Sequence, residues 1–457
     1  FSKKNNDIPL DMKLGDLIGN SPQTIIKDQT SKASFKQIMY DKNKIKKNIE
    51  KIFQLESVGS KDWLTNKVDR CVTGKVAQQQ CIGELQLPLS NCGVMALDYN
   101  GKNGVATSVG HSPLAGLIDP KIGSVNSIAK SLTNIIWAPL EKGLESVSLS
   151  ANWMWPCKNK GEDDRLYKAV EACSTFAINL GINIPTGKDS LSMTQKYDER
   201  DVLCPGTVII SAAGNCSDIN NIISPVLNKN GGDIYYIDMS NDSFYLGGSA
   251  FAQIHKSIGE NAPTIKDDLY FKKAFNIIQK LINDKKISSG HDIGSGGLIT
   301  TLMEMCFPTL NIGMDLDLDY LEEKDTSKLL FSEKIGLVIQ SKFDIGSILK
   351  KENINCIMIG RVVKKPILKV KNHSQLLELK VSNYRKKWME ISSKMEIFQT
   401  KKEFAKVRAE NVVKQPLKFK FPPKFSGIYP KKKKYTINAA VLREKGSNSE
   451  REMAYIM

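Results

Sequence analysis

The sequence predicts an α/β (α+β) protein made of more than one domain. Strand-like segments alternate with segments of helical periodicity along most of the chain, and glycine-rich turns separate them. The chain has 457 residues, of which 41% are hydrophobic, so it can bury more than one core. We therefore expect two to four domains.

The first α/β domain is expected over residues 62–228. Residues 147–153 ("VSLSANW") and 207–214 ("TVIISAAG") have the composition of strands. Residues 164–180 ("DRLYKAVEACSTFAINL") place apolar side chains at helical spacing. Residues 182–193 ("INIPTGKDSLSM") predict a short strand that runs into a glycine turn.

The second domain is expected over residues 229–385. It opens with the strand-like "GGDIYYIDM" at 231–239 and closes with "EKIGLVIQ" at 333–340 and "CIMIGRVV" at 356–363. Between them lie helical segments and a glycine-rich motif.

The remaining segments predict connections. Residues 1–61 are polar with one short apolar helix pattern, and we expect a linker with a docking helix. Residues 386–434 contain a helix and then a proline- and lysine-rich stretch, which is typical of an inter-domain linker. Residues 435–457 predict a strand, a turn and the first turns of a helix, cut off before they could bury a core. Because the chain also begins without methionine, we interpret it as a fragment.

Composition excludes several classes of protein. There is no run of about twenty apolar residues, and the first residues lack an apolar signal core, so we expect no membrane partner. The nine cysteines form no CxxC pair, and Cys173, Cys306 and Cys356 have apolar neighbours that indicate core positions. A reducing compartment, the cytoplasm, is therefore expected.

The net charge of +16 raises the alternative of nucleic-acid binding. Many of the lysines lie in "DKNKIKKNIEK" and in "KKKK" at 431–434, and no aromatic residues alternate with these runs as a base-stacking surface requires. We interpret them as solvated faces and linkers, and expect no nucleic-acid partner.

The motif at residues 289–305, "SGHDIGSGGLITTLMEM", leaves two interpretations open. Glycines before a helix N-terminus make a site for a phosphate, and the carboxylate of Asp292 can hold its metal. Alternatively, the glycines form an ordinary strand-to-helix turn in which Asp292 caps the helix.

Four stretches together resemble the large, single-chain phosphoribosylformylglycinamidine synthase family. They are residues 64–97, 149–155 with "GEDDRLY" behind it, 185–193 and 289–298. The resemblance implies one copy, the second, of an aminoimidazole-ribonucleotide-synthetase-like unit with A and B domains. It further implies that residues from Ile437 onward start a class I glutaminase domain. The family's glycine-rich ATP loop, its catalytic histidine and the glutaminase cysteine and histidine have no counterpart here, so we expect no catalytic residue in this chain and no activity from it alone.

The resemblance also implies the chemistry. The complete enzyme is a ligase of de novo purine synthesis that converts formylglycinamide ribonucleotide to the amidine with ATP and glutamine-derived ammonia. Within "GKDS", Gly187 would let the backbone approach a phosphate, Lys188 would supply charge, Asp189 would bind metal and Ser190 would donate to the substrate phosphate. The alternative for this tetrapeptide is a plain turn with a helix cap.

A second, auxiliary site for ADP and Mg²⁺ is implied at positions where this sequence departs from the family. Its metal positions fall on Asn91, Lys130, Asn134 and Asp292, and a nucleotide-binding serine falls on Gly294. Only Asn134 and Asp292 keep the family's residue. The departures make the local charge more positive by about three units, which disfavours binding of a cation. Lys130 would instead pair with a phosphate, and His291 is either a further ligand or a buttress of the turn. Two hypotheses follow: half of a ligase, or a non-catalytic half with a decayed site.

Overall fold

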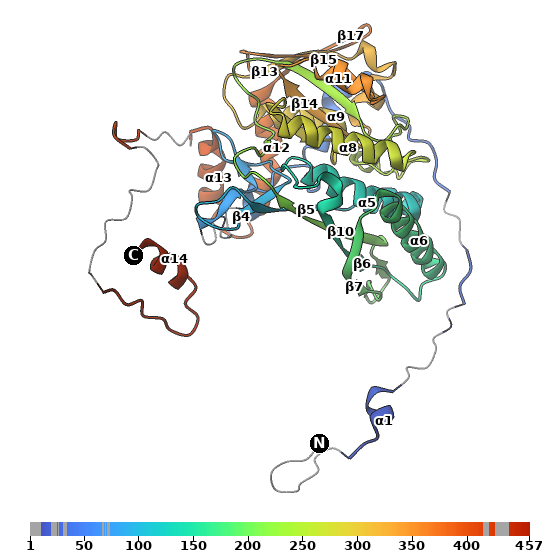
Figure 1. Cartoon of the computed structure of the whole chain (residues 1–457). Helices are drawn as coiled ribbons and strands as arrows, with labels where there is room; N and C mark the ends of the chain where they lie inside the picture. Colours follow the sequence, from blue (N-terminus) through green and yellow to red (C-terminus); the bar gives the residue numbers. More distant parts are fainter. Residues whose placement is uncertain are drawn as a thin grey trace.

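The computed structural model describes residues 11–19, 25, 27–30, 34–65, 68, 70, 74–414, 420–425 and 438–457. The described chain folds around two large sheets, stacked with helices between them (Figure 1). The first sheet has the strand order β1-β4-β5-β10-β6-β7, in which β6 and β7 are parallel and the other neighbours antiparallel. Its strands are β1 (Val76–Gln78), β4 (Gly93–Ala96), β5 (Gly104–Gly110), β6 (Val147–Met154), β7 (Asn183–Ser190) and β10 (Thr207–Cys216).

Helices cover one face of the first sheet and leave the other open. Alternate side chains of β10, such as Ile210 and Ala212, are buried on the side of the helices, whereas Ser211 and Ala213 point to the opposite face and are exposed. The side chains on that open face are mostly small or polar. The helices of this domain are α4 (Pro113–Ile118), α5 (Pro120–Ile135) and α6 (Glu162–Leu180).

The second sheet has the order β12-β14-β11-β15-β13-β16-β17. It is buried on both faces at its centre, since every residue of β14 is buried. Along β11, Ile234 and Tyr236 join one hydrophobic cluster and Tyr235 and Ile237 join another. The strands are β11 (Asp233–Asp238), β12 (Ser289–Asp292), β13 (Gly313–Asp317), β14 (Gly336–Ser341), β15 (Cys356–Val363), β16 (Ile367–Asn372) and β17 (Gln375–Lys380).

Helix α8 (Asp268–Asn283) lies between the two sheets and belongs to the core of both domains (Figure 1). Its Phe271 ring packs against Phe176 of α6, with ring centroids 5.9 Å apart. The buried side chain of Gln279 donates to the carbonyls of Ile136 and Ala138 and accepts from the amide of Leu140. The two domains therefore share one continuous apolar core.

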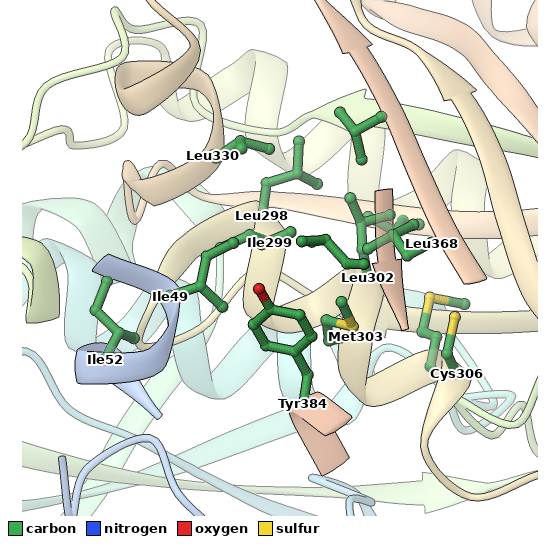
Figure 2. Close-up of a cluster of buried hydrophobic side chains, with 14 of the residues drawn as sticks. Ile49, Ile52, Leu298, Ile299, Leu302, Met303, Cys306, Leu330, Leu368 and Tyr384 are labelled. Carbon is green, nitrogen blue, oxygen red and sulfur yellow. The ribbon is translucent and has the colours of Figure 1, made fainter. Parts of the chain in front are cut away.

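The helix expected near residues 46–55 is α2 (Ile45–Ile52), and it docks on the second domain. Its apolar side chains, at helical spacing, are buried against α9 (Gly297–Cys306) and α12 (Val381–Glu396). Figure 2 shows this cluster, with Ile49 and Ile52 facing side chains of α9 and Tyr384 of α12.

The segment before α2 contacts both domains. The carboxylate of Asp28 accepts hydrogen bonds from the backbone amides of Gly161, Asp163 and Asp164 at the start of α6, at 3.0 to 3.2 Å. Farther on, Tyr40 and Lys42 both reach the carboxylate of Asp325 at 2.9 Å. Asp325 lies just before α10 (Thr326–Phe331) of the second domain.

The structure corrects three local predictions. Residues 187–190 are not a glycine turn but the last residues of strand β7, because they pair with β6. The expected boundary at residue 385 falls inside helix α12, which continues to Glu396; the helix predicted within 386–434 is confirmed, and α13 (Lys402–Asn411) follows α12. The strand predicted after residue 435 is absent from residues 438–444, although a helix, α14 (Glu450–Ile456), follows. The lysine run at 431–434 lies outside the described residues.

The other described elements are short. They are α1 (Leu14–Ile18), α3 (Asp62–Thr65), α7 (Ala250–Ile254), α11 (Ile345–Lys351), the two-stranded ladders β2 (Cys81–Ile82) with β3 (Leu87–Pro88) and β8 (Thr194–Lys196) with β9 (Asp201–Leu203), and three 3-10 helices at Gly143–Ser146, Asp319–Leu321 and Val412–Lys414. The eight described cysteines are free thiols; Cys173 and Cys306 are buried, as predicted, but Cys356 is only partly buried.

Candidate functional site

The motif at 289–305 forms strand β12, a glycine-rich loop and helix α9. Gly296 and Gly297 both have positive φ, and a Cβ on Gly297 would lie 2.7 Å from backbone atoms of residues 331 and 332. The helix begins at this turn, as the sequence predicts. Asp292 does not cap it, because the residue at the N-cap is Gly296 and no side chain caps the helix; the alternative that Asp292 is a cap is wrong.

Asp292 is a buried carboxylate held by its neighbours. The side-chain amide of Asn91 donates to both of its oxygens at 3.1 Å, and His291 Nδ1 lies 3.3 Å from Oδ1. Burial works against ionisation, but the hydrogen bonds from His291 and Asn91 and the charge on His291 hold the pKa of Asp292 below its usual range.

His291 links two carboxylates. Its Nε2 lies 3.0 Å from Oε2 of Glu304 on α9. Burial disfavours its charged form, yet the hydrogen bonds to Asp292 and Glu304 raise the pKa of His291 to about 10. Each ring nitrogen of His291 faces a carboxylate oxygen of the protein, Nδ1 toward Asp292 and Nε2 toward Glu304. The structure gives His291 the buttressing role.

Lys130 lies on α5 and points across the domain boundary. Its Nζ lies 3.4 Å from Oε2 of Glu333, and the two side chains are 14% and 8% exposed. The other oxygen of Glu333 accepts from the backbone amides of Ala250 at 2.8 Å and Gly296 at 3.0 Å. Lys130 thus has a carboxylate partner within the protein.

The pocket between the domains contains the positions predicted for the auxiliary site. Asn91, Lys130, Asn134, Asp292 and Gly294 all line one pocket of about 270 Å³. The Asn134 amide donates to the carbonyl of Val109 at 2.8 Å, and its oxygen has no hydrogen-bond partner. His111 also lines the pocket, and burial together with the Lys130 charge lowers the pKa of His111.

The donor set of this pocket does not fit a divalent cation. Of the four metal positions, only Asp292 has a carboxylate. Asn91 directs its side-chain NH₂ group, and not its oxygen, toward the oxygens of Asp292. Mg²⁺ prefers anionic oxygens, and Lys130 places an ammonium among the four positions. Within the described parts of the chain, no group of three His, Cys, Asp or Glu side chains could hold a metal.

The residues of "GKDS" lie elsewhere, on the edge strand β7. Gly187 pairs with Ala151 of β6, and a Cβ on Gly187 would lie 2.3 Å from the Ala151 carbonyl oxygen. Close strand pairing is therefore a structural reason for this glycine. Lys188 and Asp189 are exposed, and Lys188 Nζ donates to Ser190 Oγ.

A groove of about 760 Å³ on the open face of the first sheet connects the two regions. At one end it is lined by Asn91 and Asn134, which also line the pocket between the domains. At the other end it is lined by Pro185 and Thr186, directly before Gly187. The groove therefore shares Asn91 and Asn134 with the pocket between the domains, whereas Lys188, Asp189 and Ser190 lie farther along β7, beyond the residues that line the groove.

Two acidic residues near the pocket, Glu304 and Glu333, were not predicted from the sequence. Glu304 is the single charged residue in the apolar helix α9, and Glu333 is the acidic residue in the segment between α10 and β14. A lone charge in an apolar helix was a usable signal for Glu304. No pattern in the sequence indicated Glu333, because its partner Lys130 is 203 residues away along the chain.

Comparisons with known proteins agree with this architecture. The sequence profile of the FGAR-AT PurM_N-like domain matches residues 60–215, and that of the AIR synthase related protein C-terminal domain matches residues 242–372. Phosphoribosylformylglycinamidine synthases of Dictyostelium discoideum and Homo sapiens are 36% and 35% identical over 89% of this chain. The chain belongs to the phosphoribosylformylglycinamidine synthase family. It spans 33% and 31% of the length of those two relatives.

A solved structure supports the fold of this chain. The structure of T. maritima PurL complexed with FGAR aligns with this chain with a TM-score of 0.56 at 14% sequence identity. The alignment covers 74% of this chain and 53% of the PurL chain. At this identity the likeness establishes the fold alone. No described helix is long and apolar enough to cross a membrane.

Proposed function

We propose that the protein containing this chain is a phosphoribosylformylglycinamidine synthase, and that the chain supplies the second half of its synthetase region. The observation that carries the proposal is 35% to 37% identity over 89% of the chain to three enzymes of that name. The reaction would consume formylglycinamide ribonucleotide, ATP and glutamine-derived ammonia. An N-terminal synthetase half and a glutaminase domain would be its partners.

The groove on the open face of the first sheet is where this half would contribute to the active site. Phosphoryl transfer requires positive charge and donors beside the phosphates. Lys188 supplies an ammonium and Ser190 a hydroxyl at the end of β7, on the same strand as Pro185 and Thr186, which line the groove. Their mutual hydrogen bond orients the hydroxyl. Asp189 lies between them in the strand, is exposed, and directs its carboxylate to the opposite face of the sheet, because side chains alternate along a strand.

The reaction would take place in the cytoplasm, which is consistent with free thiols at the described cysteines. The Arabidopsis thaliana relative carries the words chloroplastic/mitochondrial in its name, so an organelle is the alternative location to test. Fractionation of the source cells, followed by detection of the protein, distinguishes these locations.

Ser190→Ala in the complete protein tests the proposed role of β7. Loss of a hydrogen bond to a charged group costs about 1.5–3 kcal/mol, so kcat/KM for formylglycinamide ribonucleotide should fall about 10- to 150-fold. Ser192→Ala is the matched control, because Ser192 is exposed just beyond the strand, and it should retain activity. Equal activity of the two variants would show that Ser190 does not bind the substrate.

The second candidate is a structural half that takes no part in catalysis. It is favoured by the loss of two carboxylates at Asn91 and Lys130. In that case Lys188→Ala and Ser190→Ala would both leave turnover unchanged while the complete protein remains active.

A further inference from the structure

Two polar contacts cross the boundary between the domains at the pocket. Asn91, which precedes β4 of the first sheet, donates to both oxygens of Asp292 at the end of β12 of the second sheet, at 3.1 Å. Lys130 on α5 of the first domain pairs with Glu333, next to β14 of the second, at 3.4 Å. Asp292 and Glu333 are 4% and 7% exposed, so both acceptors are shielded from water.

The same contacts occupy the groups that a phosphate or a metal would use. Glu333 accepts the amide of Gly296 at the start of α9, which is the position where a phosphate approaches a helix N-terminus. The Lys130 ammonium is paired with that carboxylate, and the Asp292 carboxylate receives the Asn91 amide. Among the described residues that line the pocket, the side-chain oxygens of Asn134 and Thr300 are buried without a hydrogen-bond partner, and both are neutral. The exposed His111 also lines the pocket.

We propose that this pocket is a lock between the two domains that needs neither nucleotide nor divalent cation. Its volume of about 270 Å³ is below the roughly 300–1,000 Å³ of ordinary ligand pockets. The Lys130–Glu333 ion pair and the Asn91–Asp292 hydrogen bonds hold the domains together directly. The lock rests on these contacts and not on the proposed synthase activity, so it is tested by stability rather than by turnover.

The first test uses the unmodified chain. Its melting temperature, measured by scanning calorimetry, should be the same with EDTA, with Mg²⁺, with ADP and with both together. An increase of about 2 °C or more with Mg²⁺ and ADP, or stoichiometric binding of ADP in a calorimetric titration, overturns the proposal, because any ligand that binds the native state stabilises it.

The second test restores the acidic positions. Asn91→Asp with Lys130→Glu puts two more carboxylates beside Asp292 and Glu333, so the variant should melt lower than the unmodified chain in EDTA and recover part of the difference in Mg²⁺. A variant that melts like the unmodified chain in EDTA contradicts the lock.

The third test is a double-mutant cycle on the ion pair. Lys130→Met and Glu333→Gln should each lower the melting temperature, and the double variant should lose less than the sum, because removing the second partner of an ion pair that is already broken costs little more. Glutamine can still accept the amides of Ala250 and Gly296 in both variants that carry it, so those bonds cancel in the cycle. Lys121→Met on the same helix is the control, because Lys121 pairs with Glu171 at 3.7 Å with both side chains about half exposed. Additive losses, or an equal loss in the control, refute a coupled lock.

Discussion

Replacing Gly187 with alanine should force strand β7 away from strand β6. A Cβ on Gly187 would lie 2.3 Å from the Ala151 carbonyl oxygen, and real Cβ atoms essentially never come closer than 3.0 Å to such an atom. The clashing atom is backbone, so no side chain can rotate to relieve it. Strand β7 lies at the edge of the sheet and is free to move only outward.

The loss of stability follows from the pairs that this movement disturbs. Gly187 lies in the middle of a parallel ladder that continues through Lys188, Asp189 and Ser190 against residues 152–154. Inserting a methyl group where there is no space costs about 1–3 kcal/mol. We expect a decrease of that size in the free energy of unfolding, measured by urea denaturation of the chain without any ligand, with an unchanged m-value.

Gly294→Ala is the matched control, since the nearest atom to its Cβ is a carboxylate oxygen of Asp292 at 3.8 Å and its φ is not positive. Its stability should stay within about 0.5 kcal/mol of the unmodified chain. If Gly187→Ala is as stable as this control, the glycine is not required by the contact with β6. A loss of activity in the complete protein without a loss of stability would then assign Gly187 to a phosphate contact instead.

Three further predictions concern other parts of the fold. Leu302→Ala, in the fully buried centre of α9, should lower the free energy of unfolding by about 2–5 kcal/mol in urea. Asp267→Ala removes the carboxylate that accepts the amide of Tyr270 at 2.9 Å at the start of α8, and should cost about 0.5–2 kcal/mol. Burial raises the pKa of Asp325, but hydrogen bonds from Lys42 and Tyr40 outweigh it and leave the pKa below its usual value. The contribution of this carboxylate is therefore present above its unfolded pKa of about 4 and is lost as the pH falls through the lower folded pKa, so Asp325→Asn should destabilise the chain more near pH 7 than near pH 3. A difference that stays constant between these pH values would contradict this assignment.

The sequence predicted elements best where apolar residues repeat at one spacing. The pattern at 164–180 corresponds to α6, which spans Glu162–Leu180, and the strand at 207–214 corresponds to β10. It failed at residues 187–190, where glycine, lysine, aspartate and serine have low strand propensity. Pairing with β6 overrides that local preference.

The sequence predicted which residues lie together in the pocket but not which contacts they make there. Resemblance to a family indicated that Asn91, Lys130 and Asp292 lie together, and they do. Motif reasoning could not anticipate that Lys130 would pair with Glu333, because the partners are 203 residues apart and come together only when the domains pack. The expectation that Lys130 would bind a phosphate therefore did not take into account the Glu333 carboxylate, which competes with a phosphate for the Lys130 ammonium.

Helix α8 determines how this chain can be divided. It starts after the expected domain boundary at residue 228, yet its Phe271 packs on Phe176 and its Gln279 holds the backbone of residues 136–140. A polypeptide ending at 228 would expose the apolar faces of α5 and α6 and leave those buried carbonyls without donors. Such a piece would aggregate rather than fold, and heating the intact chain should melt both sheets in one transition. We therefore expect the pair of domains together to be the smallest unit that folds on its own.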